Sequence, residues 1–207
     1  MRCILPGRER GLVWKRKGLR NTMDYYEMTI AGVVRRLPLC PISDSMKIGA
    51  FVMFGDVELT VAAAKALLER APEFDVLITA EAKGIPLAYE MARQSGGCRY
   101  VVARKVPKLY MRNIFSREVK SITTEACQEL FLDGEEAELM KGRRVLIVDD
   151  VISTGESLEA VEYLARQAGA DIVGRMAVLA EGGARSREDI VALEGLPLFD
   201  KDGIPLD

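Results

Sequence analysis

Two adjacent acids, followed by a turn of small residues, are the part of the sequence best suited to chemistry. Asp149 and Asp150 come directly after four aliphatic residues at 145–148, a run typical of a strand buried on both faces of a parallel sheet. Neighbouring carboxylates can accept hydrogen bonds from a pair of adjacent hydroxyl groups. They would repel a nucleoside triphosphate unless a cation lay between them.

The turn after the two acids is suited to binding a phosphate. It consists of Ser153, Thr154, Gly155, Glu156 and Ser157. The first turn of a helix offers unpaired backbone N–H groups and partial positive charge, while glycine allows close approach and hydroxyl groups add donors. The turn contains no lysine, which excludes a Walker loop. Together, the acids and the turn predict a site for a sugar phosphate.

Periodicity indicates the elements that must hold this site. Apolar residues recur at helical spacing over 157–168, and Gly169 follows as a C-terminal cap. Upstream, the pattern predicts a strand at 75–79, a helix at 85–93 and a strand at 100–103. Strands that alternate with helices predict an α/β fold with a doubly wound, mostly parallel sheet, which binds ligands at the carboxyl ends of its strands.

The remaining segments complete this prediction. Alternating apolar residues at 25–38 predict an edge strand, and Asp56 is predicted to cap a helix over 57–71. A turn is expected at 133–134 and a flexible exit at 181–185, while the form of the segment after it is left open. Three further strands are expected, at 118–123, 127–132 and 172–180.

The thirteen residues at 145–157 resemble the phosphoribosyl pyrophosphate (PRPP) signature of the type I phosphoribosyltransferase family. The resemblance implies that Asp149 and Asp150 hold the ribose 2′- and 3′-hydroxyls and that 153–157 wraps the 5′-phosphate. It also implies the family's fold with a small hood, a homodimer, and Mg²⁺ carried mainly by PRPP with help from the two acids. A buried strand ending in a solvated acidic turn is the alternative, and the full spacing argues against it.

Two loops resemble the pyrophosphate-binding segments of the same family. Residues 80–84 combine an acid, a small residue, a base and a glycine, in a loop where family members often have a non-proline cis peptide. A basic run at 104–112 resembles the start of the mobile lid, which would extend to about residue 125 and exclude water. The implied pyrophosphate contacts are Ala82, Lys83, Gly84, Arg104, Lys105 and Lys108. The implied catalytic residues are Asp149, Asp150, Lys83 and Arg104.

The accepted base is less determined. Hypoxanthine-guanine members carry an aspartate where this chain has Ser153, which favours the adenine or xanthine type. Adenine members use a lid glutamate after a Ser-Leu pair, whereas 121–123 reads Ser-Ile-Thr, closer to xanthine members. Glu118 and Glu125 are the candidates for proton transfer, and solvated acids at strand ends are the alternative for both.

The resemblance predicts an enzyme of nucleotide salvage that transfers the phosphoribosyl group from PRPP to a free purine base. The alternative is a regulator that binds PRPP and controls a nucleic acid. Such a regulator would need a nucleic-acid-binding module, and the basic tail at 1–22 is too short for a winged helix. Lys83 and the cationic lid favour catalysis instead. A phosphoacceptor domain is excluded because its acids would come from several strands.

Composition sets the outer limits. The chain has 207 residues, 49% of them hydrophobic, a net charge of -2 and no histidine, which excludes catalysis and metal binding by histidine. The four cysteines form no C-x-x-C pair, and no apolar run approaches the roughly 18 residues of a membrane helix. These features predict a cytoplasmic protein with reduced thiols and neither a membrane nor a nucleic-acid partner.

We expect one domain over 23–207, behind a basic and structureless tail at 1–22. Within this domain, the hood is expected at about 24–55 and the core at about 56–183. A C-terminal segment at 184–207 completes the chain.

Overall fold

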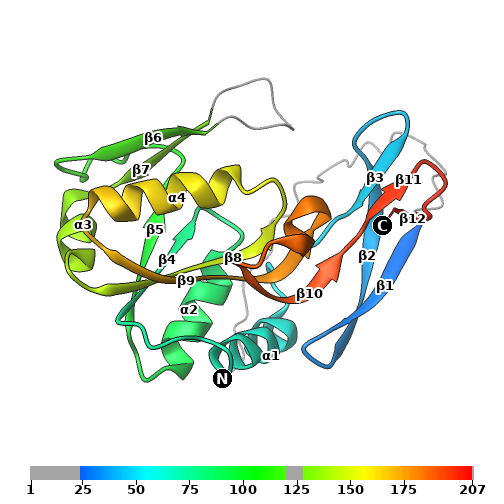
Figure 1. The fold of residues 1–207 in the computed structure, drawn as a ribbon, viewed down its shortest axis with the longest axis horizontal. Helices are drawn as coiled ribbons and strands as arrows, with labels where there is room; N and C mark the ends of the chain where they lie inside the picture. The colour runs from blue at the N-terminus through cyan, green and yellow to red at the C-terminus, as the bar shows by residue number, and fades with distance from the viewer. Residues whose placement is uncertain (1–23, 120–127, 207) are drawn as a thin grey trace, which may run out of the picture.

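The computed structural model describes residues 24–119 and 128–206, which form two five-stranded sheets and a two-stranded ribbon (Figure 1). The central sheet is parallel throughout and has the order β10-β9-β8-β4-β5. Its strands are β4 (Val76–Ala80), β5 (Arg99–Ala103), β8 (Arg144–Ile152), β9 (Asp171–Glu181) and β10 (Val191–Leu196). Helices cover both faces, so the predicted doubly wound α/β fold is confirmed.

Strand β8 lies in the middle of this sheet and contributes to both hydrophobic cores. Val145 and Ile147 belong to the core beneath α3 (Gly134–Met140) and α4 (Glu156–Gln167). Leu146 and Val148 belong to the opposite core, beneath α1 (Val57–Leu68) and α2 (Ile85–Gln94). Because successive side chains of a strand point to opposite faces, a central strand needs apolar residues at every position. The four aliphatic residues before Asp149 meet this requirement.

Helix α1 begins where the sequence predicts it and ends earlier. The side chain of Asp56 accepts a hydrogen bond from the backbone N–H of Leu59 at 3.1 Å, so the predicted cap is confirmed. The helix ends at Leu68 and not at residue 71, because the next residues form tighter turns ahead of Pro72, which disfavours helical geometry before it.

Among the described residues, no helix is long and apolar enough to cross a membrane.

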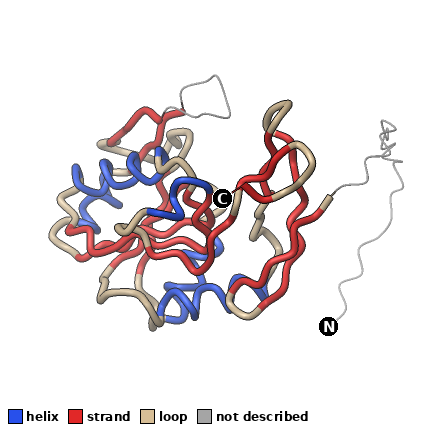
Figure 2. Tube along the Cα trace, turned by 45° about the vertical axis from the view of Figure 1, so that its right-hand side comes forward, coloured by secondary structure: helices blue, strands red, loops and turns tan. Residues whose placement is uncertain are grey.

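The second sheet, which we call the hood sheet, has the order β1-β2-β3-β11-β12 and stands beside the core (Figures 1 and 2). The single strand predicted at 25–38 is wrong, because the chain reverses at Ala31 and Gly32, both with positive φ, to form a hairpin. Its strands are β1 (Tyr25–Ile30), β2 (Val33–Pro41), β3 (Met46–Gly49), β11 (Leu198–Asp200) and β12 (Pro205–Leu206). The hairpin could not be predicted from the sequence, because alanine is seldom a turn residue.

Two loops predicted from turn residues are short helices instead. Gly134 begins α3, and a Cβ at this position would lie 2.8 Å from the carbonyl oxygen of Arg112, so the glycine serves close packing here. The predicted flexible exit is the 3-10 helix η1 (Gly182–Ser186). The strands β6 (Phe115–Val119) and β7 (Gln128–Leu132) pair antiparallel, as the expected hairpin requires, although part of its first strand, at 120–123, lies outside the described residues.

Phe199 ties the C-terminal strand β11 to the rest of the hood sheet. Its ring is fully buried, packs edge-on against Tyr26 at 4.9 Å between centroids, and lies close to Gly49. We predict that Phe199→Ala lowers the free energy of unfolding by about 3–5 kcal/mol, the usual cost of removing a buried ring. Phe54→Ala is the matched control, because Phe54 is 53% exposed. Urea denaturation checks both; equal losses would contradict this role for Phe199.

Candidate active site

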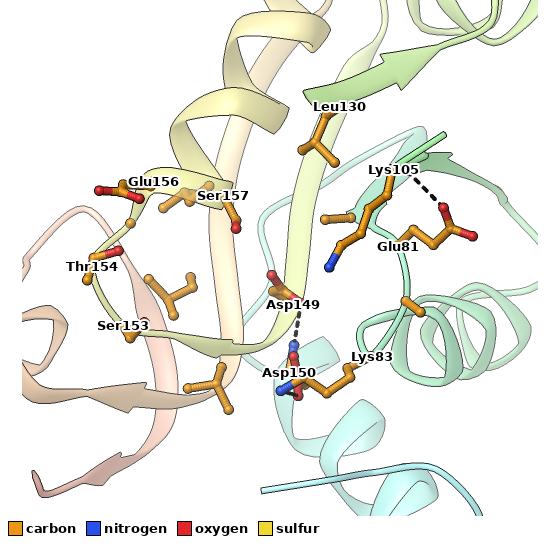
Figure 3. A pocket seen from close by; sticks show the side chains of 16 residues that line it. Glu81, Lys83, Lys105, Leu130, Asp149, Asp150, Ser153, Thr154, Glu156 and Ser157 are labelled. Carbon is orange, nitrogen blue, oxygen red and sulfur yellow. Dashed lines mark hydrogen bonds and ion pairs between the residues drawn. The ribbon is translucent and has the colours of Figure 1, made fainter. Parts of the chain in front are cut away.

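A cavity of about 440 Å³ opens at the carboxyl edge of the central sheet, between the ends of β4 and β8 and the start of α4 (Figure 3). The acid pair and both loops that the resemblance assigns to pyrophosphate binding contribute residues to this cavity. In Figure 3 the turn before α4 lies on one side of the acids, and Lys83 and Lys105 lie on the other. The lining residues are Ala80, Glu81, Ala82, Lys83, Lys105, Leu130 and the continuous run 149–158.

The two acids occupy adjacent positions of β8 and differ in their surroundings. The backbone N–H of Asp150 donates to the Oδ1 of Asp149 at 2.9 Å. Asp150 is buried, and Lys83 Nζ lies 3.1 Å from its Oδ2. This ion pair lacks hydrogen-bond geometry, so that oxygen has no hydrogen-bond donor. The floor of the cavity therefore holds a buried acceptor that a ligand could satisfy.

The charge of Asp149 is disfavoured in the unliganded site. Burial and, secondly, the neighbouring carboxylate of Asp150 raise the pKa of Asp149. The positive charge of Lys83 lowers the pKa of Asp149, but by less than burial and Asp150 raise it. Hydroxyl donors or a cation brought by a ligand would favour the ionised form.

The turn between β8 and α4 has the form of an anion site. Gly155 adopts a left-handed φ of 88° and caps the helix without a side-chain hydrogen bond to the first-turn N–H groups. Ser153, Thr154 and Ser157 are exposed and line the cavity. Free N–H groups, helix polarity and three hydroxyls together favour a phosphate.

The loop after β4 approaches the acids from the other side. The peptide bond between Glu81 and Ala82 is cis. Glu81 accepts a hydrogen bond from the backbone N–H of Lys105 at 2.8 Å, which joins this loop to the basic run after β5. A Cβ at Gly84 would overlap Thr79 Oγ1 and lie 2.9 Å from Asp149 Oδ1. Gly84 therefore permits the loop to close against β8.

Several predicted residues lie away from the cavity lining. Gly84 ends the loop and lies against Thr79 and Asp149, and Arg104 exchanges two backbone hydrogen bonds with Phe131, each of 2.8 Å. The backbone N–H of Lys108 donates to Met111 Sδ at 3.1 Å, and Lys108 does not line the cavity. Glu118 belongs to β6, whereas Glu125 and the rest of the predicted lid at 120–125 lie outside the described residues.

The structure adds six lining residues to which the sequence assigned no individual role: Ala80, Glu81, Leu130, Val151, Ile152 and Leu158. Glu81 was weakly indicated by the sequence, because it is the acid of the predicted loop at 80–84. Leu130 was not indicated, because it reads as one apolar residue in an alternating strand and reaches the cavity through the placement of β7. Across 24–119 and 128–206, no three Cys, Asp or Glu side chains gather into a group that could hold a metal ion by themselves.

The fold and a comparison with known proteins define the family of this chain. A parallel sheet with an acid pair and a glycine-containing turn at its carboxyl edge defines an α/β protein whose cavity is suited to a sugar phosphate. A family model described as phosphoribosyl transferase domain matches residues 58–202. The chain belongs to the phosphoribosyltransferase family, as the resemblance at 145–157 predicts.

Its relatives include proteins named for two purine activities. The hypoxanthine/guanine phosphoribosyltransferase of Methanococcus voltae is 35% identical over 147 residues, which are 71% of this chain and 72% of that protein. The adenine phosphoribosyltransferase of Saccharopolyspora erythraea is 32% identical over 177 residues, which are 80% of this chain and 88% of that protein.

Solved structures of adenine phosphoribosyltransferases share the fold. The structure from Rhodothermus marinus has a TM-score of 0.59 and 26% identity, covering 70% of this chain and 83% of that one. The structure from Saccharomyces cerevisiae, complexed with adenine, has a TM-score of 0.57 and 20% identity, covering 82% and 92%. The predicted type I phosphoribosyltransferase fold is confirmed.

The raised pKa of Asp149 predicts a stability that depends on pH. Between its pKa in the unfolded chain and its higher pKa in the native state, the native protein binds more protons, so stability falls as pH rises. Asp149→Asn removes this loss and keeps an acceptor for the N–H of Asp150. We predict a melting temperature about 2–4 °C above that of the unliganded wild type at pH 8, with the difference shrinking towards pH 4.

Thermal denaturation across this pH range measures the effect. Asp171→Asn is the control, because it neutralises an exposed acid at the start of β9. A difference for Asp149→Asn that stays constant with pH would contradict the prediction.

Proposed function

We propose that this protein is a purine phosphoribosyltransferase of nucleotide salvage. It transfers the 5-phosphoribosyl group from PRPP to a nitrogen of a free base and releases pyrophosphate. The observation that carries the proposal is the acid pair Asp149-Asp150 facing the turn 153–157 within one cavity. Family membership and the purine enzymes among the relatives support it.

Different parts of the cavity bind the ribose, the 5′-phosphate and the pyrophosphate of PRPP. Asp149 and Asp150 accept hydrogen bonds from the ribose hydroxyls, and 153–157 binds the 5′-phosphate through backbone N–H groups and hydroxyls. Lys83, Lys105 and Ala82 line the side of the cavity where the pyrophosphate leaves, and Gly84, next in the chain, lies just outside this lining. Arg104 and Lys108 lie outside the lining and belong to the pyrophosphate site only after the lid moves.

The reaction breaks the bond between the anomeric carbon and pyrophosphate and forms a bond to the base nitrogen. The ribosyl group acquires cationic character in between, as in glycoside hydrolysis. The carboxylates of Asp149 and the buried Asp150 stabilise that positive charge, and the lysines stabilise the negative charge on the leaving group. The ammonium group of Lys83 has three N–H donors, so it can contact Asp150 and the pyrophosphate together.

Mg²⁺ fits this site as a companion of PRPP. The acceptor of Asp150 that lacks a hydrogen-bond donor and the neighbouring carboxylate of Asp149 are hard oxygen ligands of the type that Mg²⁺ prefers. When bound, Mg²⁺ would neutralise charge on the pyrophosphate and on the two acids. The ligands would otherwise be oxygens of PRPP and water.

The base and the assembly complete the proposal. Ser153 favours adenine or xanthine, although the relatives include hypoxanthine/guanine enzymes, so the base stays a prediction. Glu118 and Glu125 stay candidates for proton transfer. We propose a cytoplasmic homodimer in which 24–55, with the paired strands of 198–206, covers the base. The regulatory alternative is less favoured, because Lys83 and Lys105 line the cavity as a leaving pyrophosphate requires.

Pyrophosphate release tests the activity. We predict release when the protein is incubated with PRPP, Mg²⁺ and one of adenine, xanthine, hypoxanthine or guanine. Asp150→Asn removes the buried charge facing the ribose and should lower kcat/KM for PRPP about tenfold to a hundredfold, the range of a lost charge-assisted hydrogen bond.

Asp171→Asn serves as the control and should leave kcat/KM unchanged, because Asp171 lies at the amino end of β9. Circular dichroism confirms the fold of each variant. If the wild type binds PRPP and releases no pyrophosphate with any base, the regulatory alternative is correct.

A further inference from the structure

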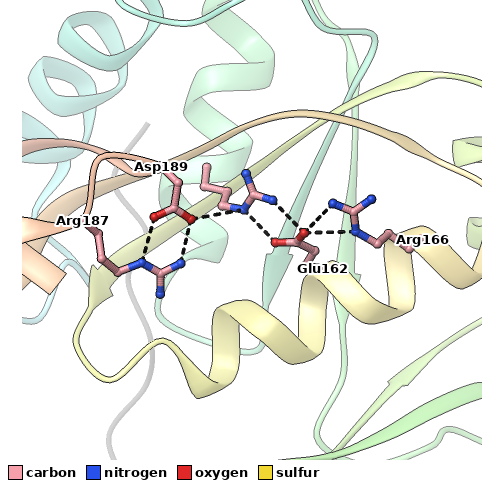
Figure 4. A network of polar contacts seen from close by, with 5 residues as sticks. Glu162, Arg166, Arg187 and Asp189 are labelled. Atoms are coloured by element: carbon pink, nitrogen blue, oxygen red, sulfur yellow. Dashed lines mark hydrogen bonds and ion pairs between the residues drawn. The ribbon is translucent and has the colours of Figure 1, made fainter.

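A chain of alternating charges connects α4 to the segment before β10 (Figure 4). Glu162 accepts hydrogen bonds from Arg166 and from Arg175, the latter at 2.6 and 2.7 Å. Arg175 Nε lies 3.9 Å from Asp189, which accepts two hydrogen bonds from Arg187, at 2.7 and 2.9 Å. Three guanidinium groups share two carboxylates, so the chain carries one excess positive charge.

The last member of this chain touches the turn that begins α4. Nε and Nη2 of Arg187 bind Asp189, and Nη1 faces Gly155. A Cβ built on Gly155 would lie 2.5 Å from that nitrogen. Figure 4 shows Arg187 reaching from the segment before β10 over the turn that leads into α4. The guanidinium therefore lies directly against Gly155 of the turn.

Acidic neighbours favour the charge of Arg187, because its hydrogen bonds to Asp189, and then the charges of Asp189, Glu159 and Glu162, raise its pKa. The N-terminus of a helix carries partial positive charge, so a guanidinium beside it adds charge of the same sign. Glu156 and Glu159 in the first turn reduce the effect. A 5′-phosphate at the turn would interact favourably with the helix and with the guanidinium, which is 31% exposed and therefore only partly screened.

We infer that Arg187 is a positioning residue for the 5′-phosphate of the substrate. It does not line the cavity; its Nη1 lies against Gly155 and adds positive charge behind the phosphate turn, with Asp189 fixing its orientation. This inference rests on the proposed function, because it names a further residue of the same phosphate site. Sequence alone gives no indication of it, since Arg187 follows η1 and lies far along the chain from 153–157.

Binding of ribose 5-phosphate and of PRPP with Mg²⁺, measured by titration calorimetry, tests this inference. We expect Arg187→Gln to weaken both ligands about fivefold to tenfold and to reduce the dependence of their affinity on salt between about 50 and 300 mM NaCl. Arg166→Gln is the matched control, because it removes the same charge from the opposite end of the same chain. It should leave affinity and salt dependence close to those of the wild type.

Arg187→Lys separates charge from folding. It keeps the positive charge and is expected to restore most of the salt dependence. Equal affinities and equal salt dependence in Arg187→Gln and Arg166→Gln would overturn the inference while the proposed function stands. Failure of the wild type to bind either sugar phosphate would contradict the proposed function itself, and the inference with it.

Discussion

The structure depends on holding two carboxylates side by side at the carboxyl end of a buried central strand. Like charges at adjacent positions oppose each other, and burial raises the pKa of Asp149 further. The surroundings offset this in part, because Lys83 pairs with Asp150 and the positive end of α4 lies across the cavity. A site of this kind is suited to a ligand that brings hydroxyl groups and a cation together. Stability is lower in its absence, as is common where function requires buried charge.

The rest of the fold keeps those two acids in place. β8 is apolar on both faces up to Asp149, so its position between β4 and β9 is determined by two hydrophobic cores at once. The loop after β4 can close against the acids because Gly84 has no side chain to collide with Thr79 or Asp149. On the other side, the alternating charges from Arg166 to Arg187 connect α4, β9 and the segment before β10. The cavity is thus bordered by elements that cannot shift independently.

The two sheets divide the work between them. The central sheet presents the candidate site at its carboxyl edge, where the first turn of α4 and the loop after β4 converge. The hood sheet takes strands from both ends of the chain, with Phe199 of β11 packed against Tyr26 of β1.

The sequence by itself determined the features that are local in the chain. The run at 145–148, the acid pair, the turn at 153–157 and the helix after it lie in one stretch, so their order and spacing specify strand, site and helix together. Only the tertiary structure decided the contacts between distant segments: Leu130 at the cavity, β11 beside β3, and Arg187 against Gly155. Periodicity reports which face of an element is buried, and it carries no information about which partner covers that face. Those partners follow from strand pairing and packing of the whole chain.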